Sequence, residues 1–144
     1  MSLKLENQTA TLKHLNFRKE KHGEEKVSSV DLKLSMLTGP SVLERFDPGL
    51  EKFLFSNAQI RFPLMKPVEW ENEIEHCSIS LAGIQIEDVK MRKFIIAPKL
   101  DAAGNKQVEL DFTLSYYPQK NNLLEIGEHV GDVVTLDIDS QELV

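Results

Sequence analysis

The chain has one cysteine, Cys77, and the residue before it is His76, so this pair is the first to consider for nucleophilic chemistry. A cysteine nucleophile needs a base within hydrogen-bond reach of its sulfur. Successive side chains of a strand point to opposite faces, and the segment around Cys77 reads as a strand, so the imidazole would not easily reach the thiol. Cys77 shares its face with Ile79 and Leu81, and we expect it in the core.

Asp137 and Asp139 are a second pair of chemical interest. Two carboxylates two residues apart on a strand share a face and could hold a cation or form a carboxylate pair. A solvated outer face on the last strand is the simpler interpretation, and we favour it. The four histidines have no shared metal spacing, and no phosphate-loop, dinucleotide-binding or zinc-protease motif occurs. We therefore expect no catalytic residues, no metal and no cofactor, and a protein that is not an enzyme.

The most highly charged stretch is FRKEKHGEEKV, residues 17–27. Gly23 permits the positive φ of a tight turn, so a hairpin tip explains it without a ligand. The alternating signs of charge would give opposite-charge pairs across such a hairpin. A loop that binds phosphate or another polyanion is the alternative, although we would expect it to contain fewer acids.

Length and charge set broader limits. A chain of 144 residues has the size of one ordinary domain, and we expect a single domain over 1–144. The net charge is −6, but residues 1–37 hold seven Lys or Arg against five acids, while 124–144 hold six acids and no Lys or Arg. No apolar run approaches the roughly 20 residues of a membrane helix, and no signal-peptide core is present. With one cysteine, these features predict a cytoplasmic protein without a membrane partner.

Three segments alternate between apolar and polar residues, which is the pattern of a strand with one face in the core: 30–36, 108–116 and 134–139. We expect their apolar residues to face inward and their polar residues, Asp31 among them, to face solvent. Less regular patterns predict further strands over 9–17, 58–64, 74–86 and 88–100, with a bend at Ala82-Gly83 and an end at Pro98. A hairpin loop is expected over 101–106.

One region favours helix. Ser41 has the spacing of an N-cap with Glu44, and Asp47-Pro48 could start a second turn. Segments 63–73 and 118–129 are expected to be loops. The predicted fold is therefore mainly β, an antiparallel sandwich or partly open barrel of six to eight strands, with one short helical segment near residues 41–55.

The strings EKHG, VDLKL, FDPGL and RFP, followed by Trp70, resemble a set of uncharacterised phage and prophage proteins that share E-K-H-G, V-D-L-x-L, F-D-P-x-L and R-F-P. The resemblance covers roughly residues 12–72 and carries no assigned catalytic residue. It implies a small phage-encoded protein of the host cytoplasm, in a family often encoded near DNA recombination and replication genes.

Two functions are consistent with these features. The first is a non-catalytic accessory module of phage DNA metabolism that binds single-stranded DNA through a basic surface with aromatic stacking platforms. Its candidate binding residues are Arg18, Lys19, Lys21, Lys26, Lys90, Arg92, Lys93, Phe94, Tyr116 and Tyr117. The alternative is a protein-protein interaction module that binds or inhibits a host or phage protein, which the net negative charge favours. A homodimer through an unpaired strand edge such as 133–138 is compatible with either function.

Overall fold

The computed structural model describes residues 3–23, 25–118 and 122–140, leaving aside the side chains at positions 20, 22, 25–27 and 122. The main strands are β1 (Lys4–His22), β2 (Glu25–Thr38), β5 (Val68–Trp70), β6 (Ile74–Leu81), β7 (Ile84–Leu100), β8 (Lys106–Tyr116) and β9 (Val133–Ser140). Two short strands, β3 (Phe55–Ser56) and β4 (Gln59–Ile60), form a separate small hairpin. The short helices are η1 (Pro40–Val42), α1 (Leu43–Phe46), α2 (Leu50–Leu54) and α3 (Asn122–Gly127).

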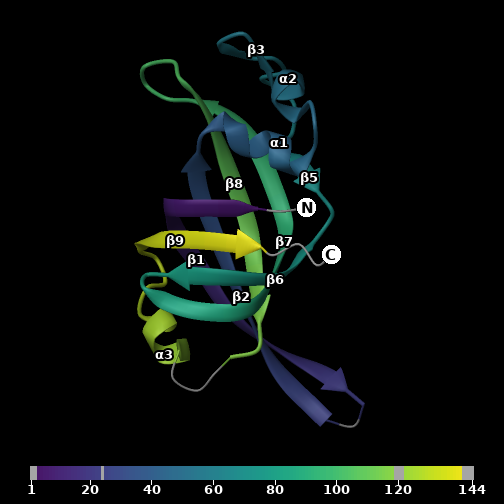
Figure 1. Cartoon of the computed structure of the whole chain (residues 1–144), viewed down its shortest axis with the longest axis vertical. Helices are drawn as coiled ribbons and strands as arrows, with labels where there is room; N and C mark the ends of the chain where they lie inside the picture. The colour runs from purple at the N-terminus through teal and green to yellow at the C-terminus, as the bar shows by residue number, and fades with distance from the viewer. Residues whose placement is uncertain (1–2, 24, 119–121, 141–144) are drawn as a thin grey trace.

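The seven main strands form one antiparallel sheet in the order β5-β7-β6-β9-β1-β2-β8. Because β8 also pairs with β7, the sheet curves round into a partial ring (Figure 1). Strands β6, β7 and β8 follow one another, and β9 returns to lie beside β6, which is a Greek-key connection. The mainly β fold and the partly open antiparallel barrel predicted from the sequence are confirmed.

The inner face of the sheet is built by the predicted period-2 patterns. The apolar positions of the three clearest strands are all buried: Val30, Leu32, Leu34, Met36, Val108, Leu110, Phe112, Leu114, Tyr116, Val134, Leu136 and Ile138. Cys77 is also fully buried with Ile79 and Leu81, as expected. Asp31 lies on the outer side of β2, opposite to the apolar set as the alternation predicted, yet its carboxylate is only 6% exposed.

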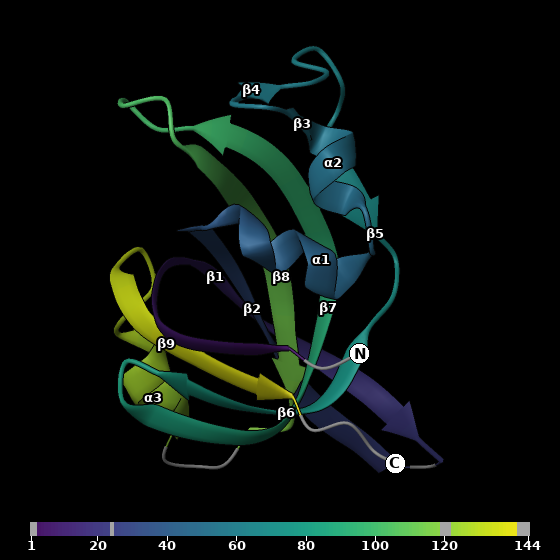
Figure 2. The ribbon, with the colours of Figure 1, turned by 45° about the horizontal axis from the view of Figure 1, so that its top comes forward.

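Short helices lie toward the two ends of the barrel (Figure 2). Leu43, Phe46 and Leu50 of α1 and α2 are buried at one end, and Ile126 of α3 is buried at the other. Two helical turns were expected over 41–55 and are present, but Ser41 makes no cap. The first turn is a 3-10 helix that starts at Pro40, and Glu44 instead accepts a hydrogen bond from the backbone N–H of Gly49 at 2.7 Å.

Several predicted boundaries were wrong. The segment 74–86 is two strands joined by a tight turn, because Ala82 and Gly83 take φ of 51° and 81°. Strand β7 runs through Pro98, which pairs with Val108 of β8 and lies beyond the residues that pair with β5, so the proline stands where the strand has one open edge. The strand expected over 58–64 is reduced to Gln59–Ile60.

The segments expected to be loops also contain regular structure. The stretch 63–73 includes the edge strand β5, and 118–129 includes α3. The expectation of an unpaired edge at 133–138 was wrong, since β9 pairs with β1 on one side and β6 on the other. No helix in the described ranges is long and apolar enough to cross a bilayer.

The hairpin of β1 and β2 extends well beyond the barrel (Figure 1). Its register sets Lys21 opposite Lys26 and Lys19 opposite Ser28. The opposite-charge cross-strand pairs expected here are therefore not formed at these positions.

Removal of the Phe94 ring tests the packing of the core. Phe94 is 1% exposed and makes edge-to-face contacts with Phe46 and Trp70, at centroid distances of 5.1 and 5.2 Å. We expect Phe94→Ala to lower the free energy of unfolding by about 3–5 kcal/mol in a urea titration. The control is Phe17→Ala, because Phe17 is 58% exposed, and it should cost less than about 1 kcal/mol. Equal losses for the two variants would contradict this packing.

Candidate nucleic-acid interface

The projecting part of the β1–β2 hairpin presents an aromatic ring and lysines on one face. Phe17 lies opposite Val30 in the register, and Val30 is fully buried in the barrel. Phe17 thus continues the inner face of the sheet, but it is 58% exposed because the hairpin has left the barrel there. Lys19 and Lys21 follow at alternate positions and are exposed. We call Phe17, Lys19 and Lys21 the hairpin face.

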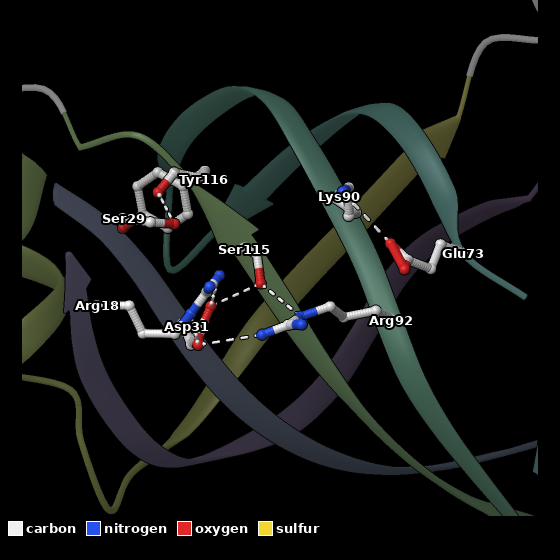
Figure 3. Close-up of polar contacts among 8 residues, drawn as sticks. All are labelled: Arg18, Ser29, Asp31, Glu73, Lys90, Arg92, Ser115 and Tyr116. Atoms are coloured by element: carbon white, nitrogen blue, oxygen red, sulfur yellow. Dashed lines mark hydrogen bonds and ion pairs between the residues drawn. The ribbon is translucent and has the colours of Figure 1, made fainter. Parts of the chain in front are cut away.

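The predicted cations Arg18 and Arg92 do not extend this face, because both are held by Asp31 (Figure 3). Arg18 Nε donates to Asp31 Oδ2 at 2.5 Å, and Arg92 Nη2 approaches the same oxygen at 3.3 Å. Ser115 Oγ donates to Asp31 Oδ1 at 2.6 Å and accepts from Arg92 Nε at 3.0 Å. This cluster ties together β1, β2, β8 and β7 on the outer side of the sheet, so the two arginines have a structural role here.

The electrostatics of Asp31 follow from these contacts. Burial by itself would raise the pKa of its carboxyl group. The hydrogen bonds from Arg18 and Ser115, together with the positive charges of Arg18 and Arg92, outweigh the burial and lower the pKa below its ordinary value. Asp31 therefore remains ionised and neutralises much of the positive charge that the sequence placed in this region.

Lys90 is neutralised in a similar way. Its Nζ lies 3.4 Å from Glu73 Oε2 and 3.6 Å from Glu75 Oε1. The charge of Glu73 is the main cause of a raised pKa for Lys90, and Glu75 adds to it. Glu73 directly precedes β6 and Glu75 lies within it, and β6 pairs with β7. Lys90 is thus matched by nearby carboxylates, which reduces what it could offer to a phosphate.

Two of the three predicted stacking residues are inside the protein. Phe94 is 1% exposed and Tyr116 is 4% exposed, so neither offers a ring face at the surface. Burial also raises the pKa of Tyr116 to about 12. Tyr117 is 51% exposed, and Lys93 is exposed on β7. The side chain of Lys26 lies outside the part of the chain that the structure describes.

A polar pocket of about 280 Å³ adjoins the Asp31 cluster and is lined by residues that include Arg18, Lys90, Arg92, Glu73, Glu75 and Asp88. Its three permanent cations face three carboxylates, so the pocket lacks the excess positive charge that a polyanion site requires.

The same pocket contains an interaction that sequence reasoning missed. His76 Nδ1 lies 2.7 Å from Asp88 Oδ1, and these residues have φ of 58° and 56°. The pairing of β6 with β7 shifts its register on both sides of Cys77, and this irregularity brings the two side chains together. A pattern of strict alternation contains no signal for such a shift.

Cys77 is not arranged as a nucleophile, and Asp137 already has a hydrogen-bond partner. Cys77 is fully buried, its thiol donates to the backbone oxygen of Ile74 at 3.7 Å, and burial raises its pKa to about 11. A thiol with a raised pKa is a poor nucleophile at neutral pH. Asp137 Oδ1 accepts a hydrogen bond from the Asn7 backbone N–H at 2.6 Å. Within the described ranges, no group of three or more His, Cys, Asp or Glu side chains could hold a metal ion.

Comparison with family models, with curated proteins and with solved structures finds no match for this chain.

The ion pairs of Asp31 predict a specific dependence of stability on pH. Asp31→Asn should lower the free energy of unfolding by about 1.5–3 kcal/mol at pH 7, because charge-assisted hydrogen bonds are lost. Folding lowers the pKa of Asp31. The stabilisation of the folded state by ionised Asp31 is therefore complete above the pKa of an aspartate in the unfolded chain, about 3.9, and is lost as the pH falls through the lower pKa of the folded state. Urea titrations from pH 7 to pH 3 should show the gap between wild type and variant narrowing only below about pH 4.

The control for this experiment is Asp47→Asn, which removes an exposed carboxylate. It should change stability by less than about 0.5 kcal/mol. A gap for Asp31→Asn that is equally large at both ends of the pH range would show that the ionised form of Asp31 is not what stabilises the fold.

Proposed function

We propose that this protein is a non-catalytic module that binds single-stranded nucleic acid through the projecting β1–β2 hairpin. The observation that carries the proposal is the composition of the hairpin face. Phe17 is 58% exposed at the base of the projection, and the exposed Lys19 and Lys21 follow it on the same side. An exposed ring beside a row of cations is the combination with which single-strand binders stack bases and neutralise phosphates.

The hairpin is also a plausible place for binding on structural grounds. Phe17 is 58% exposed, so its ring is accessible to a base. The exposed Lys19 and Lys21 stand at alternate positions of β1, on the same side as Phe17. Two cations on one side can attract a polyanion although the whole chain has a net charge of −6.

The setting that the phage resemblance implies is consistent with this proposal, since a protein encoded near recombination genes would encounter single strands. A protein-protein interaction module is the second candidate. It is favoured by a separate observation, a cluster of exposed apolar side chains near α2 and β4.

Charge removal on the hairpin is the first test of the proposed function. We expect the double variant Lys19→Gln, Lys21→Gln to bind a labelled single-stranded oligonucleotide about tenfold more weakly in fluorescence anisotropy. The slope of log affinity against log salt should decrease in magnitude by about 1.4, since each contact with a single-strand phosphate contributes about 0.7. The matched control, Lys4→Gln with Lys52→Gln, removes the same charge elsewhere. Equal effects of both double variants would rule out a hairpin-specific site.

Removal of the ring on the hairpin face tests base stacking separately. Phe17→Ala should cost about 1–3 kcal/mol of single-strand affinity, because base stacking on an aromatic side chain has that magnitude. Binding to duplex, whose bases are already stacked, should change much less. Phe53→Ala is the control, since Phe53 is 44% exposed on a different part of the surface. Absence of measurable binding by wild-type protein at micromolar concentration would refute the proposed function.

A further inference from the structure

The edge of β1 that faces away from β2 is open along the projecting hairpin. On this side β9 pairs with β1 only as far as Thr11, and the backbone of Leu12 exchanges hydrogen bonds with Gly131 and Asp132 at 2.7 and 3.0 Å. Beyond Leu12, β2 is the one described strand that pairs with β1. Residues 15–22 therefore form an unpaired edge, longer than an average strand of about 5–6 residues. We call this stretch the open edge of β1, and both views show it in the hairpin that leaves the barrel (Figures 1 and 2).

The backbone groups of alternate residues point out of this edge. In an antiparallel pair, one residue bonds to the partner strand and the next directs its N–H and C=O away from it. Leu12, opposite Leu34, bonds to the segment before β9, so its groups point away from β2. Leu15 lies opposite Leu32, two residues along β2 from Leu34, and therefore has the same orientation. The residues that follow at alternate positions share it, namely Phe17, Lys19 and Lys21.

The side chains beside the open edge indicate the chemistry of the strand that would fit there. Residues directly opposite one another in a sheet have their side chains on the same face. An added strand would therefore place alternate side chains beside Phe17, Lys19 and Lys21, the three residues of the hairpin face. Phe17 is 58% exposed, and neither lysine forms an ion pair with another described side chain. An apolar residue beside the ring and carboxylates beside the lysines would complement this face.

We propose that the open edge of β1 binds an extended acidic segment of another protein by strand addition. Hydrogen bonds to the backbone of β1 would supply the affinity, and carboxylates at alternate positions would supply the specificity. A second copy of the same edge is a poorer partner, because it would bring two more lysines to the same face. A third strand would also stabilise the hairpin, since two strands alone make a marginal sheet. This inference does not depend on nucleic-acid binding, although the segment would cover the same lysines.

The probe is the capped peptide Glu-Thr-Glu-Thr-Val-Thr-Val. In an antiparallel register its glutamates lie beside Lys21 and Lys19, and its first valine lies beside Phe17. Titration into isotope-labelled protein, followed by NMR, should show saturable binding with a Kd below about 1 mM. Binding should also slow hydrogen exchange at the amides of the outward set, because these gain partners. The outward set is Leu15, Phe17, Lys19 and Lys21, and the amides between them, which already face β2, should change little.

A second peptide controls for composition. Glu-Glu-Thr-Thr-Val-Val-Thr contains the same residues, but its adjacent glutamates would lie on opposite faces of a strand. It should bind at least about fivefold more weakly, because only one glutamate can reach the face with the lysines.

Variants at position 19 separate backbone pairing from charge. Lys19→Pro removes the outward N–H as well as the charge, and it leaves the bonds between β1 and β2 in place. It should weaken peptide binding by at least about tenfold, whereas Lys19→Gln, which removes only the charge, should weaken it about two- to fivefold. Ser28→Pro is the matched control. Ser28 lies opposite Lys19, so this proline removes an N–H from the other edge of the same hairpin, and the variant should bind the peptide like wild type.

Three results would overturn the proposal. These are no saturable binding by wild-type protein at peptide concentrations up to about 1 mM, equal binding of the two peptides, or equal losses in Lys19→Pro and Ser28→Pro. Binding that Lys19→Gln abolishes as fully as Lys19→Pro, without protection of any amide, would be an electrostatic contact and also rule out strand addition. Circular dichroism confirms that each variant is folded. The oligonucleotide experiments use no peptide, so failure here would leave the proposed function to its own tests.

Discussion

The structure depends on the burial of one face of an antiparallel sheet that curves almost completely round on itself. Each strand alternates apolar and polar residues, so curvature brings the apolar faces together and leaves few strand edges unpaired. Strand β7, 17 residues long, pairs with β6 through its first half and with β5 and β8 through its second. Asp88 and Lys93, both with φ of 56°, lie at register shifts of its pairing with β6 and β8, respectively.

The outer side of the sheet is more than a solvated surface. The carboxylate of Asp31 on β2 links four neighbouring strands. It contacts Arg18 on β1, Ser115 on β8 and Arg92 on β7. A buried carboxylate is tolerated only with such partners, because an unpaired charge out of water is costly. As a result, cations that look available in the sequence belong to the framework, and the surface open to a partner is smaller than the composition suggests.

Two opposite projections carry part of what the framework leaves exposed. The hairpin of β1 and β2 has lysines and one aromatic ring, whereas the segment around α2 and β4 has apolar side chains flanked by cations. Neither set contributes to the barrel core, so each can be changed with little effect on folding. This division allows the contributions of charge and of apolar contact to binding to be measured separately in the intact protein.

The strands whose residues repeat with period 2 could be predicted from the sequence alone. The apolar residues of three strands were assigned to the core correctly, because alternation alone decides which face of a strand is apolar. These strands span Val30 to Met36, Val108 to Tyr116 and Val134 to Ile138. The antiparallel class and the two short helical turns followed from equally local signals. The resemblance to phage proteins indicated a setting, which the comparisons leave untested.

Only the tertiary structure decided which polar residues are free. Arg18 and Asp31 are 13 residues apart, and Asp31 and Arg92 are 61 apart, so their contacts arise from strand neighbours that no local pattern specifies. Phe94 and Tyr116 face inward because β7 and β8 close the barrel, while Phe17, which occupies an equivalent inward position, is exposed because its hairpin extends past the last layer of the core. Residue type and alternation indicate which face a side chain occupies, but the extent of the barrel determines whether anything covers that face.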